Sequence, residues 1–252
     1  MNRRRLRLLL LVAATVFIVA GCSSNGSSDI SVKVGDGQAS SGNGQMALSL
    51  QLLVAITVLS LVPAILMLAT SFTRIVVVLS ILRSAIGIPN LPPNQVIMGL
   101  ALFLTLFVMS PVFAKANNDA LQPYMNNTID QNTALQRGMD PFREFMLKET
   151  RQEDLQVFID LSKEARPATA ADVSIEVLLP AFVVSELKTA FTMGFLLYIP
   201  FLIIDLVVAS ALMSMGMVMV SPTQIALPFK LLLFVMVDGW ILVVQSLVRS
   251  FG

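Results

Sequence analysis

Five charged residues interrupt the apolar carboxy-terminal third of the sequence, and their side chains are the ones there that can form ion pairs or transfer protons. They are Glu186, Lys188, Asp205, Lys230 and Asp238. A charge left in hydrocarbon costs several kcal/mol, so each needs a partner or a path to water. Glu186 and Lys188 are two positions apart and do not face each other on a helix. We expect buried pairs, within the chain or between subunits. The alternatives are side chains that reach an interface, which suits Lys230 better than the short aspartates, and a proton relay, for which the sequence shows no wet path.

The remaining inventory offers little for catalysis or metal binding. The sequence has no histidine and a single cysteine, Cys22, although these two residue types build most metal sites and most acid–base or nucleophilic mechanisms. It has neither the spacing of a nucleotide-binding P-loop nor a dinucleotide-type glycine cluster. We therefore predict that the protein is not an enzyme and has no catalytic residue, no metal site and no cofactor.

The elements that must position these charges are those of a membrane protein. Of the 252 residues, 56% are hydrophobic and 13% are charged, about half the charged share of a usual soluble domain. The mean hydropathy is +0.79. The 17 basic and 16 acidic residues nearly cancel, which leaves no basic field for nucleic acid. We predict an all-α integral membrane protein with four long hydrophobic helical segments, at about Met46–Ala69, Val96–Ala114, Thr189–Met213 and Ile225–Val248.

The amino terminus is typical of a secretory signal. Four arginines among the first seven residues precede the apolar run Leu8–Ala20, which is too short to span a membrane comfortably. Residues 1–21 are therefore predicted to be a signal peptide. Cys22 follows an aliphatic residue and two small residues, an order that makes it a lipidation candidate; ordinary cleavage nearby and an uncleaved anchor are the alternatives. Residues 22–45 are rich in serine and glycine and are expected to form a flexible tether.

The charge distribution predicts how the chain crosses the membrane. Residues 46–114 are expected to form a first hydrophobic hairpin, whose turn at 71–94 carries two arginines and no acid and is therefore placed in the cytoplasm. The polar segment 115–176 is then expected to be helical and periplasmic. Residues 177–252 are expected to form a second hydrophobic hairpin.

Two short amphipathic helices are predicted within the polar segment. Apolar residues recur there at helical spacing, in one stripe of Phe142, Phe145 and Met146 and a second of Leu155, Phe158 and Ile159. Asp140 before Pro141 is typical of a helix start, as the capping residue and the first helical position. Neither stripe is large enough to be stable alone, so each needs a partner surface.

Four methionines occur within seven residues, at positions 213, 215, 217 and 219, in a predicted loop at 213–222. Alternation at every second residue does not mark one face of a helix, and Gly216 and Pro222 favour the end of a helix and a turn. Methionine is unbranched and adaptable, so one interpretation is a seal that re-forms around changing partners. The alternative is that these are ordinary apolar residues of a membrane protein.

Several long, ordered stretches resemble one known family. They are Thr70–Ser80, Leu91–Gln95, Leu102–Thr105, Met109–Pro111, Pro141–Met146, Pro180–Phe182, Ser185–Phe191, Leu227–Lys230 and Asp238–Trp240. Together they resemble the FliP family, the flagellar biosynthetic proteins of the type III export gate. The resemblance covers about Ala47–Gly252 and is much more specific than hydropathy.

The resemblance implies a function that spacing alone does not. Members of such a family form a homo-oligomeric ring with FliQ-like and FliR-like subunits, near FlhA/FlhB-like export components, in the inner membrane at the flagellar basal body. Unfolded flagellar proteins pass through the pore. The hydrophobic segments are then helical hairpins within this assembly, in contact with lipid and with each other. In that arrangement Glu186, Lys188, Asp205 and Asp238 are expected to pair across subunits.

The resemblance also implies a pore gasket. By position it consists of Met217, Val218 and Met219, where the family commonly has a third methionine in place of Val218. The lipoprotein-like order before Cys22 is a second departure from the family pattern.

Three other functions stay open from the sequence. The first is the equivalent export subunit of a virulence-type injectisome. The second is a small-solute transporter, which predicts inverted repeats that the sequence does not show. The third is a structural lipoprotein that anchors the basal body, which explains Cys22 but not the charged carboxy-terminal helices.

Overall fold

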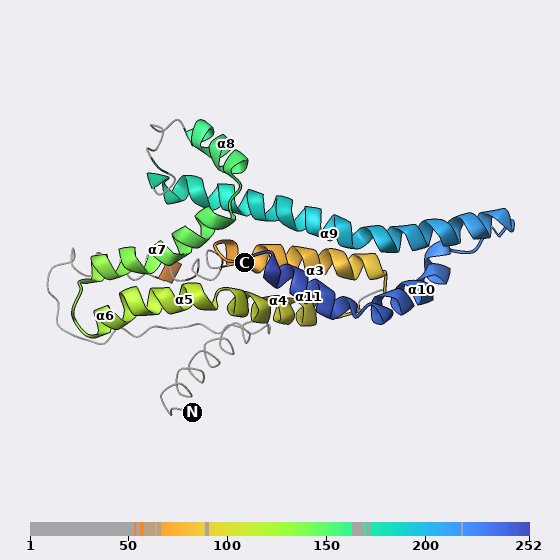
Figure 1. Ribbon diagram of the computed structural model, residues 1–252, viewed down its shortest axis with the longest axis horizontal. Coiled ribbons are helices and arrows are strands. Elements are labelled where there is room, and N and C mark those ends of the chain that lie inside the picture. Colours follow the sequence, from red (N-terminus) through yellow and green to blue (C-terminus); the bar gives the residue numbers. More distant parts are fainter. Residues whose placement is uncertain are drawn as a thin grey trace, which may run out of the picture. The chain divides into compact units, whose positions relative to one another are not determined.

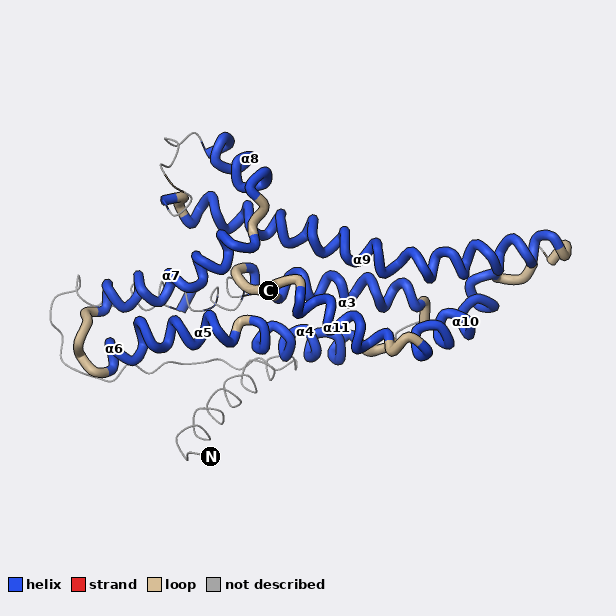
Figure 2. The backbone as a smooth tube through the Cα atoms, in the orientation of Figure 1, coloured by secondary structure: helices blue, strands red, loops and turns tan. Residues whose placement is uncertain are grey.

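The computed structural model describes residues 67–88, 91–162, 172–217 and 219–252, together with positions 53, 56, 57, 60, 64 and 169. Backbone contacts divide the chain into units 1–53 and 54–252, and almost all described residues belong to the second. The predicted signal peptide, Cys22 and the predicted tether lie outside the described residues. The elements of the described part are helical (Figure 2), which confirms the all-α class.

Nine α-helices and one π-helix make up the described elements. In chain order they are α3 (Phe72–Ile86), α4 (Asn94–Val108), α5 (Ser110–Ala116), the π-helix η1 (Asn117–Leu121), α6 (Gln122–Met125), α7 (Gln131–Glu149), α8 (Gln152–Ser162), α9 (Ile175–Ser214), α10 (Pro222–Met236) and α11 (Gly239–Arg249).

Helix α3 is the centre of the core. Its apolar residues at three- and four-residue spacing form one face, on which Ile75, Val78 and Leu79 are fully buried. This face packs along α9, and Figure 1 shows the two helices side by side. Gly87, with a left-handed φ of 79°, ends the helix. Most described residues between 71 and 94, the predicted connection of the first hairpin, belong to α3, which ends at Ile86, and α4 begins at Asn94.

Helix α9 runs without a break for 40 residues. At about 1.5 Å per residue it is roughly 60 Å long, about twice the hydrocarbon thickness of a bilayer. Pro180 and Pro200 lie inside it, which apolar helices tolerate when neighbouring helices support the freed backbone groups. Gly194 allows close approach to α3, since a Cβ there would lie 2.4 Å from Cδ1 of Ile81.

Three of the four predicted hydrophobic segments lie within the described residues, and only one of them falls in a single unbroken helix. Within the described ranges, α9 is the one helix long and apolar enough to cross a membrane. Two bent pairs reach that length only when joined: α4 with Ser110–Met125, bent by 55°, and α10 with α11, bent by 62°. The first predicted segment, Met46–Ala69, lies mostly outside the described residues.

Most described residues of the polar segment 115–176 are helical, but the predicted start of one helix is wrong. Helix α7 begins at Gln131, after Asp130, and continues through Pro141. Asp140 is therefore an interior helical residue and not a capping residue. The missing N–H of Pro141 removes one helical hydrogen bond. The helix persists there because Pro141 is itself buried and α7 packs against α5 and η1.

Candidate functional site

The deepest polar feature of the structure is a charge cluster around Arg74 on α3. Arg74 is 2% exposed, and its Nε donates a hydrogen bond of 2.8 Å to Oε2 of Glu186 on α9. Its Nη2 donates to Oε1 of Glu186 and, at 2.9 Å, to Oε2 of Glu149 at the end of α7. The planar guanidinium matches both carboxylates. One side chain thus joins α3, α7 and α9.

The same arginine also holds the carboxy-terminal residues. Its Nη1 donates to the carbonyl oxygen of Ser250 at 2.8 Å and to Oγ of the same residue at 3.0 Å. The ring of Phe251 lies 3.8 Å from the guanidinium carbon, which is a cation–π contact. Nζ of Lys148 donates to the carbonyl oxygen of Phe251 at 3.2 Å. The cluster therefore holds Ser250 and Phe251 against the core.

A second charge pair lies where α9, α10 and α3 meet. Nζ of Lys230 donates to Oδ2 of Asp205 at 2.6 Å and to the carbonyl oxygen of Ala85 at 3.2 Å. Ala85 is in the last turn of α3, where the carbonyl groups favour a cation. The Lys230 side chain is 3% exposed, and Oδ1 of Asp205 has no hydrogen-bond partner among the described residues.

The other predicted charges lie nearer the surface. Nζ of Lys188 is 3.3 Å from Oδ1 of Asp154 on α8, and its side chain is 48% exposed, so this pair contributes little. Asp238 lies at the bend between α10 and α11 with a left-handed φ of 50°. Its carboxylate is exposed and makes no capping hydrogen bond. Of the five predicted charges, the structure thus gives Glu186, Lys188, Asp205 and Lys230 partners in the same chain.

The methionine loop lies at the end of α9. Gly216 has a left-handed φ of 75° and donates its N–H to the carbonyl of Met213, and Met217 donates to the carbonyl of Leu212. This pair of bonds is a Schellman motif, which reverses the chain and exposes the loop. Met219 is 99% exposed. Val218 lies outside the described residues.

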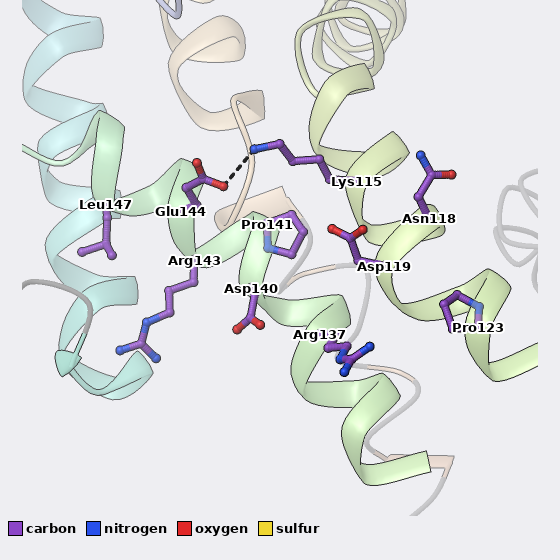
Figure 3. Close-up of a pocket in the computed structure, with 10 residues that line it drawn as sticks. All are labelled: Lys115, Asn118, Asp119, Pro123, Arg137, Asp140, Pro141, Arg143, Glu144 and Leu147. Carbon is purple, nitrogen blue, oxygen red and sulfur yellow. Dashed lines mark hydrogen bonds and ion pairs between the residues drawn. The ribbon is translucent and has the colours of Figure 1, made fainter. Parts of the chain in front are cut away.

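A polar cleft of about 900 Å³ separates α5 and η1 from α7 (Figure 3). In Figure 3, Lys115 and Asp119 extend from one wall toward α7, where Lys115 pairs with Glu144 at 3.0 Å. Acidic and basic side chains alternate around the cleft. In the described part of the chain, no three His, Cys, Asp or Glu residues are grouped as metal ligands would be.

Arg74, Glu149 and the polar cleft are features that the sequence did not single out. The signal for Arg74 is a cation in the first turn of a mostly apolar helix, which requires buried acceptors. Glu149 has no comparable signal, because its position 75 residues from Arg74 gives no periodicity to read. The cleft depends on the π-helix η1, for which the sequence carries no clear mark.

Comparisons with known proteins agree on one family. A family model described as the FliP family matches residues 55–247. The flagellar biosynthetic protein FliP of Bacillus subtilis is 53% identical over 203 residues, which cover 81% of this chain and 92% of that protein. The protein of the same name from Pectobacterium carotovorum is 54% identical over 210 residues, covering 83% and 81%. That from Aquifex aeolicus is 49% identical over 251 residues, 99% of each chain.

Proposed function

The chain belongs to the FliP family, and from this premise we propose that it is a subunit of the flagellar protein export gate. Unfolded flagellar proteins would leave the cytoplasm through the pore of this gate. The observation that carries the proposal is similarity over nearly the whole chain to proteins named for flagellar biosynthesis. The subunit would act as conduit and seal, and not as an enzyme, with energy supplied by other components.

We infer a homo-oligomeric ring that also includes FliQ-like and FliR-like subunits and works with FlhA/FlhB-like components. Support comes from large apolar side chains that the single chain leaves uncovered. Phe103 and Phe107 on α4 are 72% and 69% exposed, and Phe195 and Leu206 on α9 are 64% and 71% exposed. Surfaces of this kind must be covered by lipid or by protein partners.

We infer an inner-membrane location at the basal body, with the polar segment 115–176 in the periplasm. The length of α9 supports this, because about half of a 60 Å helix must extend beyond the hydrocarbon layer. The four hydrophobic segments would be helical hairpins packed within the assembly. In that arrangement the cluster at Arg74 is shielded by protein on every side and does not face lipid.

The proposed gasket is the loop segment formed by Met217, Val218 and Met219. Met217 is 42% exposed and Met219 is 99% exposed, so both side chains are available to line an opening. Flexible thioether side chains suit a seal that must deform around different polypeptides and close again. Val218 is stiffer, because it is branched at Cβ.

Deletion of the gene in its own bacterium tests the proposal. Cells lacking the chain are expected to have no hooks or filaments by electron microscopy, and a plasmid copy is expected to restore both. The matched control is a plasmid copy with Lys188→Met, which removes only an exposed pair. Normal filaments in the deletion strain would contradict the proposal.

A further inference from the structure

Among the described residues, two charges near the same end of α3 remain without an ionic partner. The first is Asp238, whose backbone carbonyl accepts the N–H groups of Ile241 and Leu242 at 2.9 and 3.1 Å while its carboxylate makes no capping bond. Aspartate at a helix start normally uses its carboxylate for this purpose. No ion pair of Asp238 exists in the described part of the chain.

The surroundings of Asp238 are apolar and uncovered. Val235 is 70% exposed, Met236 is 75% exposed and Ile241 is 57% exposed, so the carboxylate lies within an exposed apolar surface at the bend between α10 and α11. Gly239 allows the backbone at this bend to approach Phe234 closely, because a Cβ there would lie 2.2 Å from the ring of Phe234. When this surface is buried in an assembly, the carboxylate loses water and requires a cation.

The second charge is Arg83, in the last turn of α3. Its Nη1 donates to Oδ1 of Asn94 at 3.4 Å, a long bond, and no carboxylate of the described residues lies within ion-pair distance. The side chain lines a pocket of about 430 Å³ whose other polar walls are the small residues Ser80, Ser84 and Asn94. The guanidinium therefore has unused donors beside open space.

Leu82 on α3 lines one pocket with Val237 and Gly239, the neighbours of Asp238, so both charges lie near the same end of α3, but no ion pair joins them within one chain. Lys230 of α10 binds the carbonyl of Ala85 in the last turn of α3, which places α10 beside the end of α3 that carries Arg83. Asp238 follows at the end of α10. One surface carries the carboxylate of Asp238 among exposed apolar side chains, and the other carries the guanidinium of Arg83 in a pocket. The two surfaces differ, but their charges and shapes are complementary. Two different surfaces of one chain form a head-to-tail contact, which is the type that closes into rings.

We propose that Asp238 of one copy inserts into the Arg83 pocket of the next copy in the ring. This inference rests on the proposed oligomeric gate and names one of its subunit contacts. Each copy supplies one carboxylate and one guanidinium, so every contact between neighbours satisfies both charges. The fork of the guanidinium can bind a carboxylate through two N–H groups.

Cross-linking between differently tagged copies tests the contact directly. One copy carries Arg83→Cys and the other Asp238→Cys, both with Cys22→Ser, and a short bis-maleimide is added to membranes. We expect a cross-linked dimer that carries both tags. The matched control pairs Asp238→Cys with Arg249→Cys, an exposed cation at the far end of α11. The proposal would be overturned if oligomers were intact on native gels but the Arg83→Cys and Asp238→Cys copies did not cross-link. It would also be overturned if the control pair cross-linked to the same extent.

Charge exchange provides a second test that does not depend on cysteine reactivity. Arg83→Asp alone and Asp238→Arg alone place like charges together, and each should reduce the oligomer in membranes at least about tenfold. The double variant Arg83→Asp/Asp238→Arg should recover it to within about twofold, because the pair is restored with reversed polarity. No recovery, with both single variants inserted and protease-resistant, would refute the contact. That result would leave export by the parent chain unaffected. Failure of the proposed contact can therefore be distinguished from failure of the proposed export function.

Discussion

Replacing Arg74 by methionine should destabilise the fold more than any single surface change. The methionine side chain would keep most of the volume. It would leave Glu186, whose side chain is 0% exposed, without a cation, and Glu149, whose side chain is 8% exposed, with only Lys148 at 4.0 Å. Breaking a buried ion pair by removing one partner costs about 3–5 kcal/mol, a large share of a total stability of about 5–15 kcal/mol. At about 2–4 °C per kcal/mol for a chain of this size, the melting temperature should fall by roughly 6–20 °C.

The measurement is thermal unfolding of the purified chain in detergent, compared with two other variants. The triple variant Arg74→Met/Glu149→Gln/Glu186→Gln removes the charges together and should recover much of the loss, because no unpaired carboxylate remains. Lys188→Met should change the stability by at most about 1 kcal/mol, or the melting temperature by a few degrees, because its pair is largely exposed. Equal effects of Arg74→Met and Lys188→Met would refute the assignment of a buried cluster.

Three further predictions concern the methionine loop and the start of α7. The double change Met217→Ala/Met219→Ala should make membranes with assembled gates leak small ions in a conductance assay; unchanged conductance would exclude a gasket role. Gly216→Ala should destabilise the loop by about 1–2 kcal/mol, because a residue with a Cβ disfavours the left-handed φ of 75°. Amide hydrogen exchange should then be faster at the end of α9 than in the parent chain. The side chain of Thr133 donates a hydrogen bond to Asp130 and lowers the pKa of that carboxyl below its ordinary value. The stabilisation of the α7 start by Asp130 is therefore present above the unfolded-state pKa and is lost as the pH falls through the lower folded-state pKa. Carbon-13 titration should show this pKa rising in Thr133→Val, and an identical titration curve in the two proteins would count against the bond.

The sequence was sufficient for the fold class and for several boundaries, since these depend on local patterns. Hydropathy and helical spacing predict an all-helical chain, and the glycine and proline around the methionines predict the end of α9 and a turn after it. The interior position of Pro141 was not predictable in the same way, because tertiary packing against α5 and η1 overrides its local preference for a helix start.

The partners of the charges lie beyond what sequence spacing can reveal. Glu186 requires a cation, but nothing local indicates Arg74, which is 112 residues away. Likewise, Lys230 meets the end of α3 through Ala85, 145 residues away in the chain. Such contacts arise only when α3 packs against α9 and α10. The need for a partner can therefore be predicted from the sequence, and its identity requires the structure.

The most direct test of the central claim is to measure export itself. Hook and filament proteins are quantified in the culture medium and in the cytoplasm of a deletion strain, with and without a plasmid copy of the gene. A gate subunit predicts that these proteins are made but stay inside the deletion strain and return to the medium with the plasmid. Hook and filament proteins in the medium of the deletion strain at parental levels would contradict the account.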